Sequence, residues 1–197
     1  MEDIRRILKG FEKFEENEQI IKVFGTIVYS DAHAHIKKVL KDEDYWKALD
    51  KISGNRWAIF AARALQGRRE IRGGDPPGSL GMMIQAWVEP EENKKLIEAL
   101  GLETTEKPVF VVFTRLNNGE ILKSVIELYD TSIEKTYQRI KKIVQDITAS
   151  IEQIEEENIS DYESVFNAVD MTVQRIKTVD TLKRIFAVYK WFKRIKP

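Results

Sequence analysis

The 197-residue sequence contains no cysteine, which excludes disulfide bonds, thiolate metal sites and thiol redox chemistry. It has only two histidines and no run of 18 apolar residues, so no membrane-spanning helix is predicted. Its first residues are charged throughout, and we expect no cleaved secretion signal. The 32 basic and 32 acidic side chains cancel, which argues against a protein that binds nucleic acid over its whole surface. Together these absences lead us to expect a cytoplasmic protein.

The apolar patterns predict an α/β domain with a mixed sheet of four or five strands. Runs rich in β-branched and aromatic residues predict strands. These runs are 20–29, 56–63, 82–88, 109–116 and 121–129. Apolar residues at helical spacing predict helices. These are an N-terminal helix at 2–16, two pieces within 33–52 ending before Gly54, one at 91–100, one from 133 onward, and two more at 161–177 and 179–196.

The turn between the last two predicted strands has a specific signal. Residues 117–120 read Asn-Asn-Gly-Glu. An Asn-Gly step supplies the positive φ angles that a tight hairpin needs. We therefore predict a hairpin at this position.

The order of elements over residues 20–145 resembles the thioredoxin superfamily. In that family a strand leads through a short helix to a cis-proline, which opens a strand. That strand turns by a hairpin into an edge strand and a final helix. The matching pieces here are MIQAWVEPEENKKLIEALGL, then EKPVFVVFTRLNNGEILKSVIEL, then the helix from 133. The resemblance implies a cis peptide at Pro108 and a domain spanning 1–145, followed by a helical extension at 146–197.

The family's active motif follows the strand at 56–63, and this chain has Ala64-Leu65-Gln66-Gly67-Arg68 there. Without a sulfur nucleophile no mixed disulfide can form. The resemblance therefore implies a scaffold that is reused for binding, with no cofactor. Fold alone does not assign a function.

A second motif, Asp31-Ala-His33-Ala-His35, looks like the D-x-H-x-H metal signature of amidohydrolases. Two imidazoles and a carboxylate suit zinc. Those enzymes draw further histidines from later strands and form an eight-stranded barrel, for which this chain is too short. We expect instead the start of a helix, with Ser30 or Asp31 as its cap and no catalytic metal. A metal-dependent hydrolase centred on these residues is the first alternative function.

Residues 64–81 contain five glycines and two prolines, and we predict an exposed loop. Arg68, Arg69 and Arg72 lie in it, where they could bind an anion or a partner. The spacing matches neither the phosphate-binding loop nor the dinucleotide fingerprint. An accessory protein that binds anions or nucleic acid is the second alternative.

The carboxyl end is polarised in charge. Residues 146–170 hold eight acidic side chains and no basic one, whereas 181–197 hold six basic side chains and no acidic one. The apolar stripe from Ile133 to Ile154 is longer than a thioredoxin-like sheet can cover, and its outer half needs other partners. We expect association through six residues, with the acidic region 152–163 facing basic residues of 183–196. The six are Ile147, Ile151, Ile154, Phe186, Tyr189 and Trp191.

The sequence thus predicts a non-catalytic binding or assembly module that binds a protein partner, most simply a second copy of itself in a homodimer. A basic amphipathic helix also allows binding to an anionic membrane or to single-stranded nucleic acid, which we favour less.

Overall fold

The computed structural model describes residues 23–30, 32–54, 57–63, 96–102, 107–116, 118–154 and 161–195. For residues 62, 63 and 188–195 it describes the main chain only. The predicted N-terminal helix at 2–16, the predicted strand at 82–88 and the glycine-rich loop at 64–81 lie outside these ranges.

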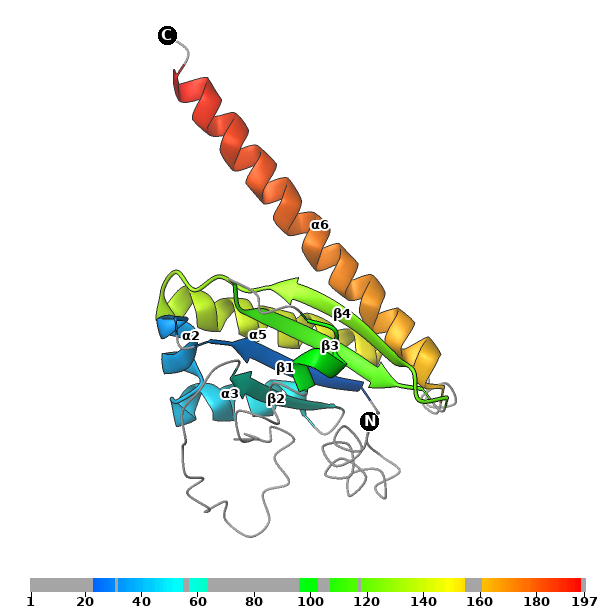
Figure 1. Ribbon diagram of the computed structural model, residues 1–197. Coiled ribbons are helices and arrows are strands. Elements are labelled where there is room, and N and C mark those ends of the chain that lie inside the picture. The colour runs from blue at the N-terminus through cyan, green and yellow to red at the C-terminus, as the bar shows by residue number, and fades with distance from the viewer. Residues whose placement is uncertain are drawn as a thin grey trace.

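A four-stranded mixed sheet forms the centre of the molecule (Figure 1). Its strands are β1 (Val23–Tyr29), β2 (Ala58–Arg63), β3 (Val109–Arg115) and β4 (Ile121–Glu127), in the order β2-β1-β3-β4. Strand β1 pairs parallel with β2 and antiparallel with β3, and β3 pairs antiparallel with β4. The predicted α/β class and mixed sheet are confirmed.

The hairpin between β3 and β4 is also confirmed. Gly119 has a φ of 88°, and its N–H donates to the carbonyl of Leu116 at 2.9 Å. The N–H of Leu116 in turn donates to the carbonyl of Glu120 at 2.8 Å. Glycine adopts this backbone conformation without the steric cost that a side chain would add.

Four helices cover one face of the sheet: α2 (Ala34–Val39), α3 (Glu43–Ser53), α5 (Ile133–Glu152) and the first half of α6 (Tyr162–Ile195). Helix α3 begins at Asp42, whose carboxylate accepts from two main-chain N–H groups, and ends at Gly54 as predicted. Alternate strand residues such as Ile27 and Val112 point toward these helices, as the two-residue period of a strand requires.

The opposite face holds a second, smaller apolar cluster. A helical turn at 96–100 places Leu96, Ile97 and Leu100 against it. Phe24 and Phe113 contribute from β1 and β3, with ring centroids 5.6 Å apart. This turn is the described end of the helix predicted at 91–100. The sheet is therefore buried on both sides.

Helix α6 corrects one prediction. The sequence predicted two helices, 161–177 and 179–196, but the structure has one helix of 34 residues. No glycine or proline interrupts residues 177–181. The hydroxyls of Thr178 and Thr181 donate to the carbonyls of Gln174 and Lys177, four residues earlier, and so fit inside a continuous helix.

The predicted cis peptide at Pro108 is wrong, because the described residues contain no cis peptide bond. Pro108 directly precedes β3, where its missing N–H breaks no ladder hydrogen bond, and its carbonyl accepts from Leu128 at 2.8 Å. The most specific support for the thioredoxin resemblance is thereby removed. The boundary proposed at residue 145 falls inside α5, which continues without a break to Glu152.

Candidate interaction surface

The two histidines lie at the start of α2. His33 is the N-cap residue, and its Nδ1 accepts from the main-chain N–H of Ser30 at 2.9 Å. The cap hydrogen bond that we predicted from Ser30 or Asp31 comes instead from Asp130, whose Oδ1 accepts from the N–H of Ile36 at 2.8 Å. A carboxylate that follows β4, at the same end of the sheet, therefore fixes this helix end.

A metal site is not assembled by the described part of this motif. His33 turns its Nδ1 to the main chain, His35 lies in the first helical turn, and Asp31 lies outside the described residues. Among the residues that the structure describes, no group of three or more His, Cys, Asp or Glu could hold a metal ion. Arg68, Arg69 and Arg72 also lie outside the described residues.

The isoleucines of α5 predicted to associate with another molecule lie inside this one. Ile147 and Ile151 are buried, and Ile154 packs at the margin of the same cluster. The first half of α6 covers them with Val165, Val169, Val173 and Ile176. Of the six predicted association residues, Ile147 and Ile151 are therefore corrected to core positions, because the chain supplies its own cover, and Ile154 is partly buried beside them.

Phe186 is exposed to solvent, whereas Tyr189 and Trp191 are among the residues whose side chains the structure does not describe. Phe186 belongs to the half of α6 that projects beyond the sheet (Figure 1). Every described side chain from Thr181 to Ala187 is exposed.

The apolar face of α6 changes side along the helix. The inner face, Val165, Val169, Val173 and Ile176, repeats every three or four residues and points to the core. Leu182 follows Val173 by nine residues, which is about two and a half turns, so it points the opposite way. A straight helix cannot bury both faces against its own body.

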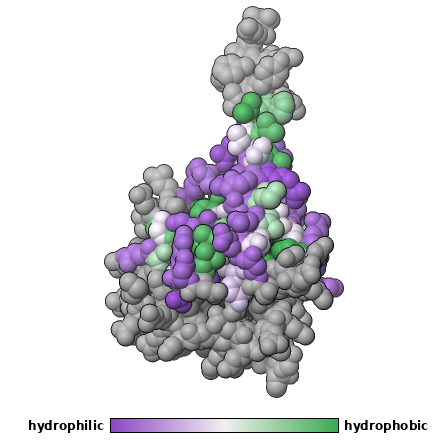
Figure 2. All heavy atoms as spheres, turned by 90° about the vertical axis from the view of Figure 1, so that its right-hand side faces the viewer, coloured by the Kyte–Doolittle hydropathy of each residue, from purple (hydrophilic) through white to green (hydrophobic). Residues whose placement is uncertain are grey.

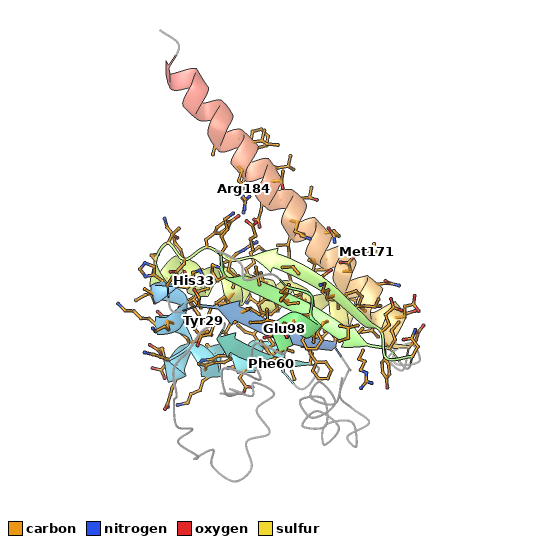
Figure 3. The ribbon with its side chains drawn as sticks, in the orientation of Figure 1. Tyr29, His33, Phe60, Glu98, Met171 and Arg184 are labelled. Atoms are coloured by element: carbon orange, nitrogen blue, oxygen red, sulfur yellow. The ribbon has the colours of Figure 1, made fainter. Side chains whose placement is uncertain are left out.

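The exposed large apolar residues of α6 gather in its projecting half, with Met171 about two turns earlier, and we call them the outer stripe. It consists of Met171, Val179, Leu182, Ile185 and Phe186, with relative exposures of 74%, 43%, 47%, 57% and 61%. Figure 2 shows hydrophobic surface on the projecting helix below the atoms drawn in grey. In Figure 3 Met171 lies on the side of α6 away from the sheet. Such a stripe can bind another apolar helix face but offers no acid, base or nucleophile for catalysis.

A group of polar side chains, which we call the clasp, fixes α6 where it leaves the sheet. Asp180 and Arg184 continue the inner face, each four residues after the previous inward position. Their partners come from the end of β4 and from α5, and Lys107, which precedes β3, binds one of these partners, Glu127. The clasp consists of Lys107, Glu127, Tyr129, Arg139, Asp180 and Arg184.

The Arg139–Asp180 ion pair is the most buried part of the clasp, with both side chains at least 85% shielded, at exposures of 13% and 15%. Arg184 donates to the hydroxyl of Tyr129 at 2.6 Å and to Glu127 at 3.1 Å. Its guanidinium lies 5.4 Å from the Tyr129 ring centroid, within the range of a cation–π contact. Because the Arg184 side chain is largely exposed, solvent screens its ion pair with Glu127, and the shielded Arg139–Asp180 pair is the firmer anchor.

The clasp also affects ionisation. Hydrogen bonds from Lys107, and then from Arg184, lower the pKa of Glu127 below its ordinary value of 4.5. Glu127 therefore stays charged, and the clasp intact, at neutral pH. On the inner face of the same helix Asp170 accepts a hydrogen bond from Ser124 of β4. These contacts hold the projecting half of α6 in a fixed direction.

Sequence reasoning missed the clasp because its members are up to 77 residues apart, from Lys107 to Arg184, and share no local pattern. The outer stripe did carry a signal. The apolar residues of 165–176 and those of 182–186 lie on opposite faces of the helix. Such a change of face indicates a helix that contacts two different surfaces.

Comparison with known proteins finds no family model, no curated protein and no solved structure that matches the chain. Within the described parts of the chain, no helix is both long and apolar enough to cross a membrane.

Proposed function

We propose that this chain is a non-catalytic assembly module with a thioredoxin-like body, and that it associates with a second copy of itself through the projecting half of α6. The body is supported by the element order: a parallel β1–β2 pair joined by helices, then the β3–β4 hairpin with β4 at the sheet edge of the described strands, then α5. The absence of cysteine supports a binding role for such a body rather than a redox one.

The outer stripe is the single observation that carries the proposal. From Val179 to Phe186 its large side chains are exposed at consecutive turns of one helix, on the side that the body cannot reach. Contiguous exposed apolar surface of this kind marks an interaction site on a soluble protein. The clasp adds support, because an arm held in a fixed direction loses less conformational entropy on binding than a free one.

A charge placed in the stripe tests the proposal. Leu182 is 47% exposed, so a dimer can still bury about half of it, which contributes about 1 kcal/mol per copy. Two copies lose that contribution together, and each introduced carboxylate also loses hydration. We expect Leu182→Glu to weaken dimerisation by at least about a hundredfold in Kd, measured by sedimentation equilibrium.

Thr181→Glu is the matched control. Thr181 is the neighbouring residue and also exposed, and it lies about 100° around the helix from Leu182. It adds the same charge outside the stripe, so its dimer should persist. Full chain that is monomeric at about 100 μM would overturn the proposal. Binding of that monomer to vesicles with anionic lipid, or to single-stranded nucleic acid, would show instead that the basic end of α6 serves that ligand.

A further inference from the structure

The proposed association leaves open how two α6 helices lie, and the charges of the chain decide between the arrangements. Residues 181–197 carry six basic side chains and no acidic one. A parallel pair places both basic segments side by side, as does an antiparallel pair confined to the projecting halves. Juxtaposed like charges oppose association.

A longer antiparallel overlap removes this repulsion. It places the basic end of each helix beside the start of the other, where Asp161 and Glu163 are exposed acidic residues. The surface needed is open, because the outward residues of the first half of α6 are exposed. These are Ser164, Asn167, Met171, Gln174, Arg175 and Thr178.

The outward residues repeat with steps of four and three, as in the seam of a coiled coil. The exposed seam positions are Met171, Arg175, Thr178, Leu182 and Ile185, and the half-buried Ala168 continues the same spacing. In one antiparallel register Met171 faces Leu182 of the second copy and Ala168 faces Ile185, so that large side chains meet smaller or flexible ones. In the same register Arg175 faces Thr178, which keeps the polar positions together.

This register also aligns the charges. It brings residues 190–192 of one helix opposite residues 161–163 of the other. Lys190 then lies opposite Glu163, and the basic end of the helix lies beside Asp161. From this agreement of shape and charge we infer that two copies pair antiparallel along α6, with Met171 of each against Leu182 of the other. The inference rests on the proposed function.

The absence of cysteine makes disulfide cross-linking a direct test, since every bond formed must join introduced residues. Full-length Met171→Cys is mixed with full-length Leu182→Cys carrying a tag of different mass. A disulfide requires Cβ atoms about 3.5–4.5 Å apart, which only facing positions meet. We expect mixed-mass dimers to form at least about tenfold faster than either variant cross-links with itself.

Thr178→Cys mixed with Leu182→Cys is the control for register, because residue 178 lies seven residues, about 10 Å, from residue 171 along the helix. This pair should cross-link slowly. Faster bonding of Thr178→Cys to Leu182→Cys would overturn the register. Rapid self-cross-linking of Leu182→Cys would overturn it as well, because residue 182 would then face itself, in a parallel pair or in a short antiparallel one.

Failure of this inference and failure of the proposed function give different results. A parallel pair leaves the protein a dimer through α6, so only the antiparallel inference fails. A dimer in which none of these pairs cross-links overturns the inferred register. The proposed function fails as well only if Leu182→Glu leaves that dimer intact. A monomer by sedimentation equilibrium would overturn both as well.

Discussion

Gly25, in the middle of β1, is the position at which the packing of the sheet against its helices is most exacting. A Cβ added there would lie 2.7 Å from Cζ3 of Trp57 and 3.0 Å from Cζ of Phe110. Carbon atoms at ordinary contact are about 3.5–4.0 Å apart, so the Trp57 ring would have to move by about 0.8 Å. Both aromatic side chains are fully buried.

The Trp57 ring cannot move freely. Its Nε1 donates to Oγ1 of Thr148 on α5 at 3.0 Å, so a shift either weakens this hydrogen bond or displaces α5. Overpacking of this kind costs about 1–3 kcal/mol. Replacing glycine within a strand returns about 0.5–1 kcal/mol through the lower entropy of the unfolded chain. We therefore expect Gly25→Ala to lower the free energy of unfolding by about 1–2 kcal/mol.

Urea unfolding followed by circular dichroism, at one fixed protein concentration, measures this change. Phe110→Leu provides the second arm of a double-mutant cycle. It removes one of the two contacts, so the double variant should be more stable than the sum of the two single effects predicts. Gly25→Ala protein that is as stable as the parent, or more so, would refute the packing of Trp57 over β1.

Three further predictions concern single hydrogen bonds. Thr148→Val should lower the free energy of unfolding by about 1–3 kcal/mol, since it leaves the indole N–H of Trp57 buried without an acceptor; thermal unfolding against Thr148→Ser, which keeps a hydroxyl, checks this. Asp130→Ala removes the acceptor for the N–H of Ile36 and should cost about 0.5–2 kcal/mol, while Asp130→Asn retains most of the stability. Glu127 has a pKa below 4.5, so the stability that its charge contributes is complete above pH 4.5 and is lost as the pH falls through the lowered pKa. The difference in unfolding free energy between the parent and Glu127→Gln should therefore shrink between pH 6 and pH 3. A difference that stays constant over this range would contradict the clasp.

The sheet could be predicted from sequence because its signals are local. Runs such as 109–116 combine β-branched and aromatic residues, and Gly119 marks the hairpin by its own conformational freedom. The boundaries were accurate to within three residues, and the capping of α3 at Gly54 was visible in the sequence.

The errors concern features that depend on distant contacts. Helix α6 was divided near Thr178 because its apolar pattern changes phase there, although the main chain continues. The change in the apolar pattern marks a change in the surface that the helix contacts, and not a break in the helix. Asp130 as the cap of α2 could not be predicted, since 94 residues separate it from Ile36.

The same limit applies to the interaction surface. The apolar stripe of α5 is longer than its sheet can cover, and no sequence pattern distinguishes cover by the same chain from cover by a second one. The structure assigns Ile147 and Ile151 to the chain's own core and leaves Leu182, Ile185 and Phe186 exposed. The hypothesis of association therefore rests on the projecting half of α6 alone.

The central claim is that the projecting half of α6 joins two copies of the chain. Light scattering, over protein concentrations from about 1 to about 200 μM, tests it on the full chain and on a chain ending at Asp180. The shorter chain keeps the inner face of α6 and the Arg139–Asp180 pair, so its body should stay folded by circular dichroism. We predict twice the 22.9 kDa chain mass for the full chain at the higher concentrations and a monomer for the shorter one. A full chain that stays monomeric throughout, or a shorter chain that dimerises equally well, would contradict the account.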